Sequence, residues 1–288
     1  MHSEIELVKD IADCPPVPRR QRALEPGPDA ALEAVELMGL RLHNLHRDRI
    51  AAKVAEAAIA RRKLLVVNAN AHMMVLAQKL PWLRGLFRSA DISFCDGAGV
   101  QLAARLLKGR GIHRTTPPEW IGTALQALGA DASIFWLGGE VEVAQTAARR
   151  FELLYGVRTA GVQHGFFDTA PGSADTLAVV GRINAARPSI LLVNMGMPLQ
   201  ERWLWENWER LPDCVAITAG ALVDHAAGRV QRPPRWVANL GVEWLIRLIH
   251  EPRRLWRRYL LGLPAFGYYM LRYAVLDGWD ISRSGSRR

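Results

Sequence analysis

Short apolar runs alternate along this chain with segments whose apolar residues recur at helical spacing. Five runs, 63–68, 92–95, 133–137, 190–193 and 214–218, are each followed within two residues by glycine or a polar residue, and a weaker run spans 157–162. Strands that are buried on both faces of a parallel sheet have continuous apolar sequences of this kind. Helical spacing occupies the intervals, most clearly over 48–62, 72–79, 100–107 and 141–154. The alternation predicts an α/β fold with a layered, largely parallel sheet.

The sequence suggests three regions. Residues 1–30 are rich in proline and charge, so we expect a poorly ordered lead-in there. The α/β core should span 31–228, because the strand patterns end before Arg232-Pro-Pro234. We expect residues 229–288 to form a basic, aromatic, helical appendage.

The appendage carries nearly all of the net charge. It holds 12 arginines and no lysine against four acidic residues, which is +8 of the chain's total of +9. Four of the five tyrosines and four tryptophans lie among these arginines. Guanidinium groups bind phosphate oxygens in pairs, and Trp and Tyr favour the lipid–water boundary. This composition favours a phosphate-bearing ligand near a membrane surface, although a charge run is also typical of a solvated helix face.

The remaining composition indicates a cytoplasmic protein. Three cysteines without a Cys-x-x-Cys pair favour a reducing compartment over disulfides or a zinc site. Acidic residues interrupt the first 20 positions, which argues against a signal peptide. The most apolar stretch, 259–276, contains Pro264 and Arg272, so we expect it to lie at an interface and not to span a bilayer.

Four predicted strands end in glycine or polar residues, at 68–70, 96–99, 138–139 and 194–196. Ligands of parallel sheets bind beyond these carboxyl ends, where glycine lets backbone N–H groups approach phosphates. A single such glycine is ordinary turn chemistry. Four together favour a site of nucleotide size.

Individual residues at these ends keep two interpretations. Asp96 follows a strand and is either a general base or the cap of the next helix. Gln200 and Glu201 lie in the first turn of a helix after Pro198, where they either favour the helix dipole or bind a polar ligand. Gly97-Ala-Gly99 lacks the third glycine of a dinucleotide fingerprint, which disfavours a nicotinamide cofactor. With no Asp-x-Asp and scattered histidines, we expect no metal site.

The same positions resemble the WecG/TagA/CpsF family of bacterial glycosyltransferases over about 35–266. The shared motifs, in order, are Asn68-Ala-Asn70, Ala90 to Gly99, Arg114, Phe135 to Gly139, His164-Gly-Phe-Phe167, Asn194 to Glu201, Gly220 to Gly228, and Arg232-Pro-Pro-Arg-Trp236 through Leu260. Each early motif is weak alone, but their order and the C-terminal signature are specific. The resemblance implies a Rossmann-like, type E glycosyltransferase fold with a C-terminal helical appendage.

The resemblance also implies a reaction. It is the inverting, metal-independent transfer of a hexose from a UDP-sugar to a polyprenyl-diphosphate-linked sugar, at the inner face of the cytoplasmic membrane and without a cofactor. Asp96 would be the general base. The donor would be held by the strand-end and helix positions Asn68, Asn70, Arg114, Gly138, Gly139, Gln200 and Glu201. The diphosphate would be bound by Arg247, Arg254 and Arg257.

This chain departs from the family pattern at a few positions. Asn68 replaces a frequent Thr, Pro117 and Glu119 follow Arg114 where Gly and Asp are usual, and Leu199 replaces a Lys. These departures bear on the donor sugar, for which glucose, N-acetylmannosamine and its uronic acid are the family's range. A glucose-type donor for exopolysaccharide is our slight preference among them. The oligomeric state stays open, a homo-oligomer included.

A different class of function also fits the tail. A peripheral lipid- or nucleic-acid-binding protein would use the basic appendage without chemistry. The glycine-rich strand ends and Asp96 favour the enzyme, with no nucleic-acid partner, because a pure binder needs neither.

Overall fold

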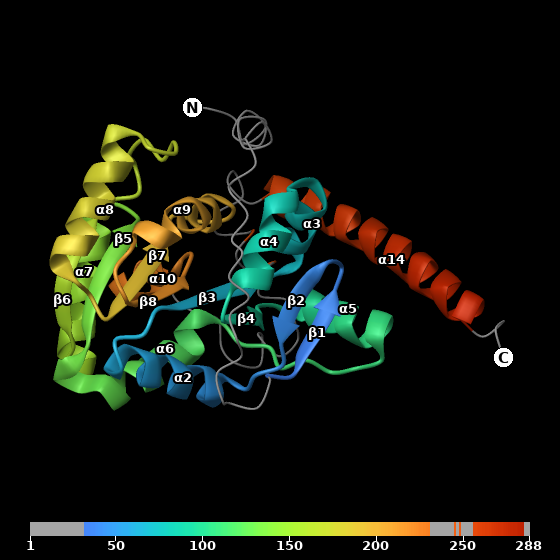
Figure 1. The fold of residues 1–288 in the computed structure, drawn as a ribbon, viewed down its shortest axis with the longest axis horizontal. Helices are drawn as coiled ribbons and strands as arrows, with labels where there is room; N and C mark the ends of the chain where they lie inside the picture. The colour runs from blue at the N-terminus through green and yellow to red at the C-terminus, as the bar shows by residue number, and fades with distance from the viewer. Residues whose placement is uncertain (1–31, 231–244, 246–247, 249–255, 285–288) are drawn as a thin grey trace.

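The computed structural model describes residues 32–230, 245, 248 and 256–284, so the predicted lead-in lies outside it (Figure 1). A sheet of six strands in the order β4-β3-β8-β7-β5-β6 forms its centre, and every pair of neighbouring strands is parallel. The strands are β3 (Leu64–Ala69), β4 (Ile92–Cys95), β5 (Ser133–Gly138), β6 (Arg158–Gln163), β7 (Ile190–Asn194) and β8 (Val215–Thr218). The predicted α/β fold is confirmed, and it is Rossmann-like.

Helices cover both faces of this sheet. One face is covered by α3 (Ala71–Lys79), α4 (Pro81–Ser89), α5 (Ala98–Lys108), α8 (Ala174–Ala186) and α9 (Leu199–Asn207). The other face is covered by α2 (Arg47–Ile59), α6 (Pro117–Leu128), α7 (Val141–Tyr155) and α10 (Leu222–Ala227). Alternate residues of each strand point to opposite faces, so the sheet separates two apolar cores.

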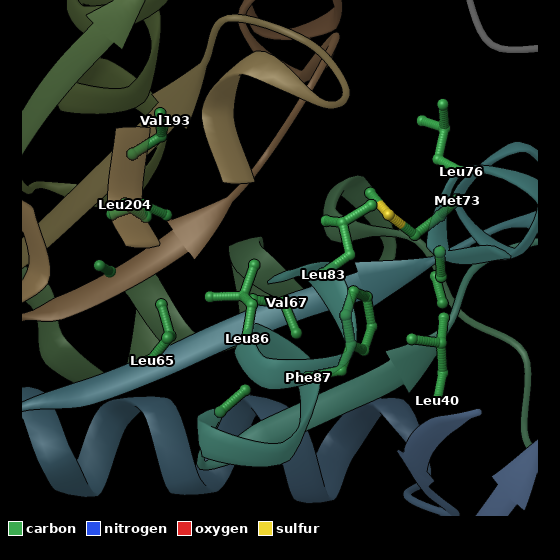
Figure 2. Packing of buried hydrophobic residues seen from close by; sticks show 14 of the residues in the cluster. Leu40, Leu65, Val67, Met73, Leu76, Leu83, Leu86, Phe87, Val193 and Leu204 are labelled. Atoms are coloured by element: carbon green, nitrogen blue, oxygen red, sulfur yellow. The ribbon is translucent and has the colours of Figure 1, made fainter. Parts of the chain in front are cut away.

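The core around α3 and α4 shows how the apolar runs are used. Leu65 and Val67 of β3 point to the same side as Val193 of β7, and α4 lays Leu83, Leu86 and Phe87 against them (Figure 2). These helix residues recur at positions i, i+3 and i+4, and all three are fully buried. Proline at the first turn of α4 suits a helix start, because its missing N–H has no partner there anyway.

A small antiparallel hairpin precedes the sheet. It consists of β1 (Ala34–Leu37) and β2 (Leu40–His43), and its turn places Met38 and Gly39 at positive φ. His43 is 4% exposed at the end of β2, where its Nδ1 accepts a hydrogen bond from the Ser93 N–H at 2.9 Å. Burial, aided by the charge of Arg41, lowers the pKa of His43 to about 4. The imidazole is therefore neutral in the folded protein at neutral pH.

This buried imidazole makes stability depend on pH. The unfolded chain takes up a proton near pH 6.5, whereas the folded chain resists protonation until about pH 4, so the free energy of unfolding falls as pH falls through this window. Between pH 7 and pH 5 we expect a loss of about 2 kcal/mol from His43 alone. Urea unfolding of the wild type and of His43→Asn, which keeps an acceptor for Ser93, measures it. An equal loss in both proteins would contradict the assignment.

A long C-terminal helix, α14 (Gly262–Ser284), follows one turn of π-helix at Arg257–Leu261 and extends away from the body (Figure 1). Its first half packs against α3 and α5. Phe266 is 5% exposed within the core, and the Tyr273 hydroxyl lies 3.2 Å from Oε1 of Gln78 on α3. Within the described ranges, none of the helices combines the length and hydrophobicity that crossing a bilayer requires.

Candidate active site

The connections of the sheet create a crevice at its carboxyl edge. After β5 the chain turns into α7 on one face, whereas after the neighbouring strand β7 it turns into α9 on the other face. The chain leaves β3 and β8, also neighbours, to opposite faces in the same way, through α3 and α10. Ligands of open parallel sheets bind where successive connections diverge like this. The predicted strand-end residues therefore meet at one edge of the sheet.

Asp96 occupies the edge-strand end of this row. It follows β4 directly, is partly buried, and its backbone N–H donates to the Ala69 carbonyl at 2.8 Å. The N-cap residue of α5 is Gly97, at φ +118°, and not Asp96. The negative charge of Asp96 and, more strongly, burial raise the pKa of the neighbouring Cys95 thiol. Asp96 thus lies at the carboxyl end of β4, next to the buried, protonated thiol of Cys95.

Arg114 lies beside β4, the strand that Asp96 follows. It pairs with Cys95 in an isolated parallel bridge, and the Thr115 N–H donates to the Cys95 carbonyl at 3.0 Å. The positive charge of Arg114 lowers the pKa of the Cys95 thiol, whereas the negative charge of Asp96 raises it. Both charges are therefore close to the same sulfur atom. A cation and a carboxylate consequently flank the end of β4.

Asn68 and Asn70 connect three neighbouring strand ends. Asn68 is buried, and its Nδ2 donates to the Thr218 carbonyl of β8 at 3.0 Å. Asn70 caps α3, because its Oδ1 accepts from the Met73 N–H at 3.0 Å, and its Nδ2 lies 3.3 Å from the Met197 sulfur of the β7–α9 loop. Both asparagines therefore fix the strand-end loops, and their predicted contact with a donor stays a prediction.

Gly138 is the last residue of β5 and Gly139 follows it, and a side chain at either position would press against neighbouring atoms. A Cβ at Gly138 would lie 2.4 Å from the carbonyl carbon of Asn194, and one at Gly139 would lie 3.2 Å from Val223. Both residues have positive φ, at +114° and +72°. Gly196, at φ +79°, has open space around its Cβ position. Because these three positions carry no side chain of their own, their backbone can approach a diphosphate closely.

Gln200 and Glu201 are fully buried at the start of α9. Gln200 Nε2 donates to Glu201 Oε1 at 2.7 Å, and its Oε1 accepts from the Gly220 N–H at 3.1 Å. In this arrangement Gln200 fixes the turn after β8, which lies between the ends of β3 and β7. Sequence analysis foresaw neither this bond nor the burial, because the partners are 20 residues apart and meet only in the sheet. Their contact with the donor stays a prediction.

The three arginines that are predicted to bind the diphosphate cannot be placed relative to these strand ends. Arg247 and Arg254 fall outside the described residues, and only the backbone of Arg257 is described. Within the described ranges, no three His, Cys, Asp or Glu side chains gather as metal ligands. A hollow of about 500 Å³ lies between α6, α7 and α10, and most of the residues that line it are apolar.

Two features were missed by the sequence analysis, and only the first of them has a clear sequence signal. Pro117 and Glu119, noted only as departures from a family pattern, start α6: Glu119 Oε2 accepts from the Thr116 N–H at 2.8 Å in a capping box. Thr-Pro-Pro-Glu is typical of such a helix start. Thr218, which accepts from the Asn68 N–H at 3.3 Å, is the last residue of the predicted strand 214–218 and carries no other sequence signal.

A comparison with protein families agrees with this architecture. The model of the glycosyl transferase WecG/TagA/CpsF family matches residues 35–278. That range contains the whole six-stranded sheet, the crevice and most of α14. The chain belongs to the WecG/TagA/CpsF family of glycosyltransferases.

Proposed function

We propose that this protein is an inverting glycosyltransferase of cell-surface polysaccharide biosynthesis, moving a hexose from a UDP-sugar to a polyprenyl-diphosphate-linked sugar. The observation that carries the proposal is the row of strand ends with Asp96 and Arg114 at β4 and bare backbone at Gly138, Gly139 and Gly196. Such a row provides one carboxylate for proton transfer and backbone for a diphosphate.

The proposed chemistry is a single displacement. Asp96 accepts the proton of the acceptor hydroxyl while that oxygen bonds to the anomeric carbon of the donor. The bond between the anomeric carbon and the β-phosphate oxygen breaks, and UDP leaves with the electron pair. Attack opposite to the leaving group inverts the anomeric configuration. Arg114, and the predicted ligands Arg247, Arg254 and Arg257, would stabilise the charge that develops on the diphosphate.

The proposed site of action is a membrane surface, and the exposed face of α14 supports it. Tyr268, Leu271 and Val275 recur at spacings of three and four residues and are 62%, 67% and 57% exposed. Leu260 and Leu261, in the π-helical turn that precedes α14, are exposed as well. Exposed apolar side chains on a helix beside basic residues are typical of binding to an anionic lipid interface.

Placing charge on this face should release the protein from lipid. We expect Leu271→Glu/Val275→Glu to lower binding to phosphatidylglycerol vesicles by at least about tenfold, because two apolar side chains no longer enter the interface. Vesicle co-sedimentation measures this. The matched control is Ile59→Glu/Leu153→Glu, with equal charge on exposed residues of α2 and α7 across the sheet. Equal losses in both variants would argue against a specific role of α14.

The reaction itself is tested with a panel of donors. Wild-type protein is mixed in EDTA with a polyprenyl-diphosphate-linked acceptor and UDP-glucose, UDP-N-acetylmannosamine or its uronic acid, and released UDP is measured. We expect release with one donor and only when acceptor is present. Release from no pair would favour the alternative of a non-catalytic peripheral binding protein, and release only with added metal would overturn metal independence.

A further inference from the structure

The connection between α5 and α6 carries Arg114 to the end of β4. It spans residues 109–116 and contains Gly109 and Gly111, so its sequence imposes little conformation of its own. Outside helices and strands, a backbone keeps one conformation only where hydrogen bonds or packing hold it. The contacts that hold this connection therefore decide where the charge of Arg114 lies.

Before Arg114, the connection is held by α5 and by the residue that follows β2. The His113 N–H donates to Asn44 Oδ1 at 2.9 Å. Gln101 Nε2 of α5 donates to the Ile112 carbonyl at 2.8 Å. Ile112 itself is 4% exposed and belongs to the apolar core. These contacts fix the chain up to the residue before Arg114.

After Arg114, one carboxylate oxygen holds the chain. Glu119 Oε2 accepts from the Thr116 N–H at 2.8 Å and from the Thr115 hydroxyl at 3.2 Å. Thr115 is 1% exposed, and its own N–H donates to the Cys95 carbonyl at 3.0 Å. Because burial removes water as an alternative partner, the Thr115 hydroxyl depends on this carboxylate for its acceptor.

These bonds connect Glu119 with the two charges at the end of β4. Arg114 and Cys95 pair in the isolated parallel bridge, and Asp96 follows Cys95 along the chain. Without the carboxylate of Glu119, the Thr115 hydroxyl and the N–H of the next residue both lose their acceptor. The backbone directly after Arg114 must then shift to satisfy them, and the guanidinium shifts with it.

We infer that Glu119 is a positioning residue, which holds the guanidinium of Arg114 where it stabilises the leaving diphosphate. The inference rests on the proposed function, which gives Arg114 this electrostatic role, and it adds the residue that makes the role possible. Glu119 acts through the backbone of the connection and not on a reacting atom. A displacement of about 1 Å in a group that acts on the transition state costs up to about 10²-fold in rate.

Two variants separate the hydrogen bonds of Glu119 from its charge. In Glu119→Gln the amide oxygen can replace Oε2 and accept both bonds, whereas Glu119→Ala removes the acceptor. UDP release in the presence of acceptor gives the turnover number. We expect a loss of about ten- to hundredfold in Glu119→Ala and a value within about threefold of wild type in Glu119→Gln.

A second glutamate provides the matched control. Glu152 Oε1 on α7 also accepts from a backbone N–H, that of Thr159 at 2.9 Å. Thr159 lies near the amino end of β6, whereas the crevice lies at the carboxyl ends of the strands. We expect Glu152→Ala to lower the melting temperature as Glu119→Ala does, because both lose a carboxylate that binds backbone, and to keep the wild-type turnover number.

A double-mutant cycle tests whether Glu119 acts through Arg114. Turnover numbers are compared for wild type, Glu119→Ala, Arg114→Met and the double variant. If the carboxylate acts by holding the guanidinium, its removal has no effect once the guanidinium is gone. The double variant should therefore match Arg114→Met within about twofold, although each single variant is slow.

The other outcomes contradict the inference. Losses that add in the double variant, or a turnover number of Glu119→Gln as low as that of Glu119→Ala, would overturn it and leave the proposed function in place. An unchanged turnover number in Glu119→Ala, or equal losses in Glu119→Ala and Glu152→Ala, would do the same. Absence of UDP release by the wild type with every donor would instead remove the proposed function, and the inference with it.

Discussion

Asp96→Asn should lower the turnover number of glycosyl transfer by about 10² to 10⁴-fold, the range expected when a general base is lost. Asparagine has nearly the same shape and keeps the backbone bond from residue 96 to Ala69, but its amide cannot accept the proton of the acceptor hydroxyl. The affinity for UDP should stay within about twofold, because the diphosphate binds at other strand ends. Steady-state kinetics and titration with UDP measure the two quantities.

A second aspartate provides the control for this variant. Asp213 is exposed and lies just before β8, at the amino ends of the strands, whereas Asp96 lies at their carboxyl ends. We expect Asp213→Asn to transfer sugar at the wild-type rate. Full activity in Asp96→Asn would remove this carboxylate from the mechanism, and loss of UDP binding together with activity would indicate a structural role.

Gly138→Ala should disrupt the centre of the crevice. The new methyl group would lie 2.4 Å from the Asn194 carbonyl carbon and 2.9 Å from the Met195 backbone nitrogen, and φ is +114°. Since these neighbours are backbone atoms in the adjoining strand end, β5 and β7 must separate there. We expect the free energy of unfolding to fall by about 2 to 4 kcal/mol, together with a loss of UDP affinity.

Gly181 offers the opposite case in the same fold. It lies within α8, and a Cβ there meets nothing within 4 Å. Gly181→Ala should therefore raise the free energy of unfolding by about 0.5 to 1 kcal/mol, because alanine favours helix. Urea unfolding compares the three proteins. Wild-type stability in Gly138→Ala would show that the strand ends have more freedom than their distances indicate.

The strands of the six-stranded sheet were predictable because strands that are buried on both faces have continuous apolar sequences. The predicted strand 92–95 coincides with β4, and β5 and β7 differ from their predictions by one residue. The β1–β2 hairpin was missed although Leu37 and Leu40 point inward and Glu36 and Arg41 outward around Gly39. Its strands have only four residues each, too few for alternation to stand out.

The site was predictable as a set of strand ends but not as an arrangement. That Gly138 packs against Asn194 depends on β5 and β7 being neighbours, and strand order is not written in any local pattern. Sequence likewise gives no sign that Gln200 is buried and bonds to Gly220, since polar residues in a first helical turn are usually exposed. The predicted division of the chain near Gly228 stays a prediction, as do the roles of the tail arginines.

The most direct measurement is the structure of the product. Wild-type protein is incubated with the donor that releases UDP and with a polyprenyl-diphosphate-linked acceptor, and the lipid product is analysed by mass spectrometry and by NMR of the anomeric proton. We expect the mass of the acceptor to rise by one hexosyl residue, with an anomeric configuration opposite to that of the donor. Retention of the donor's configuration, or UDP release without any gain in acceptor mass, would contradict direct displacement assisted by Asp96.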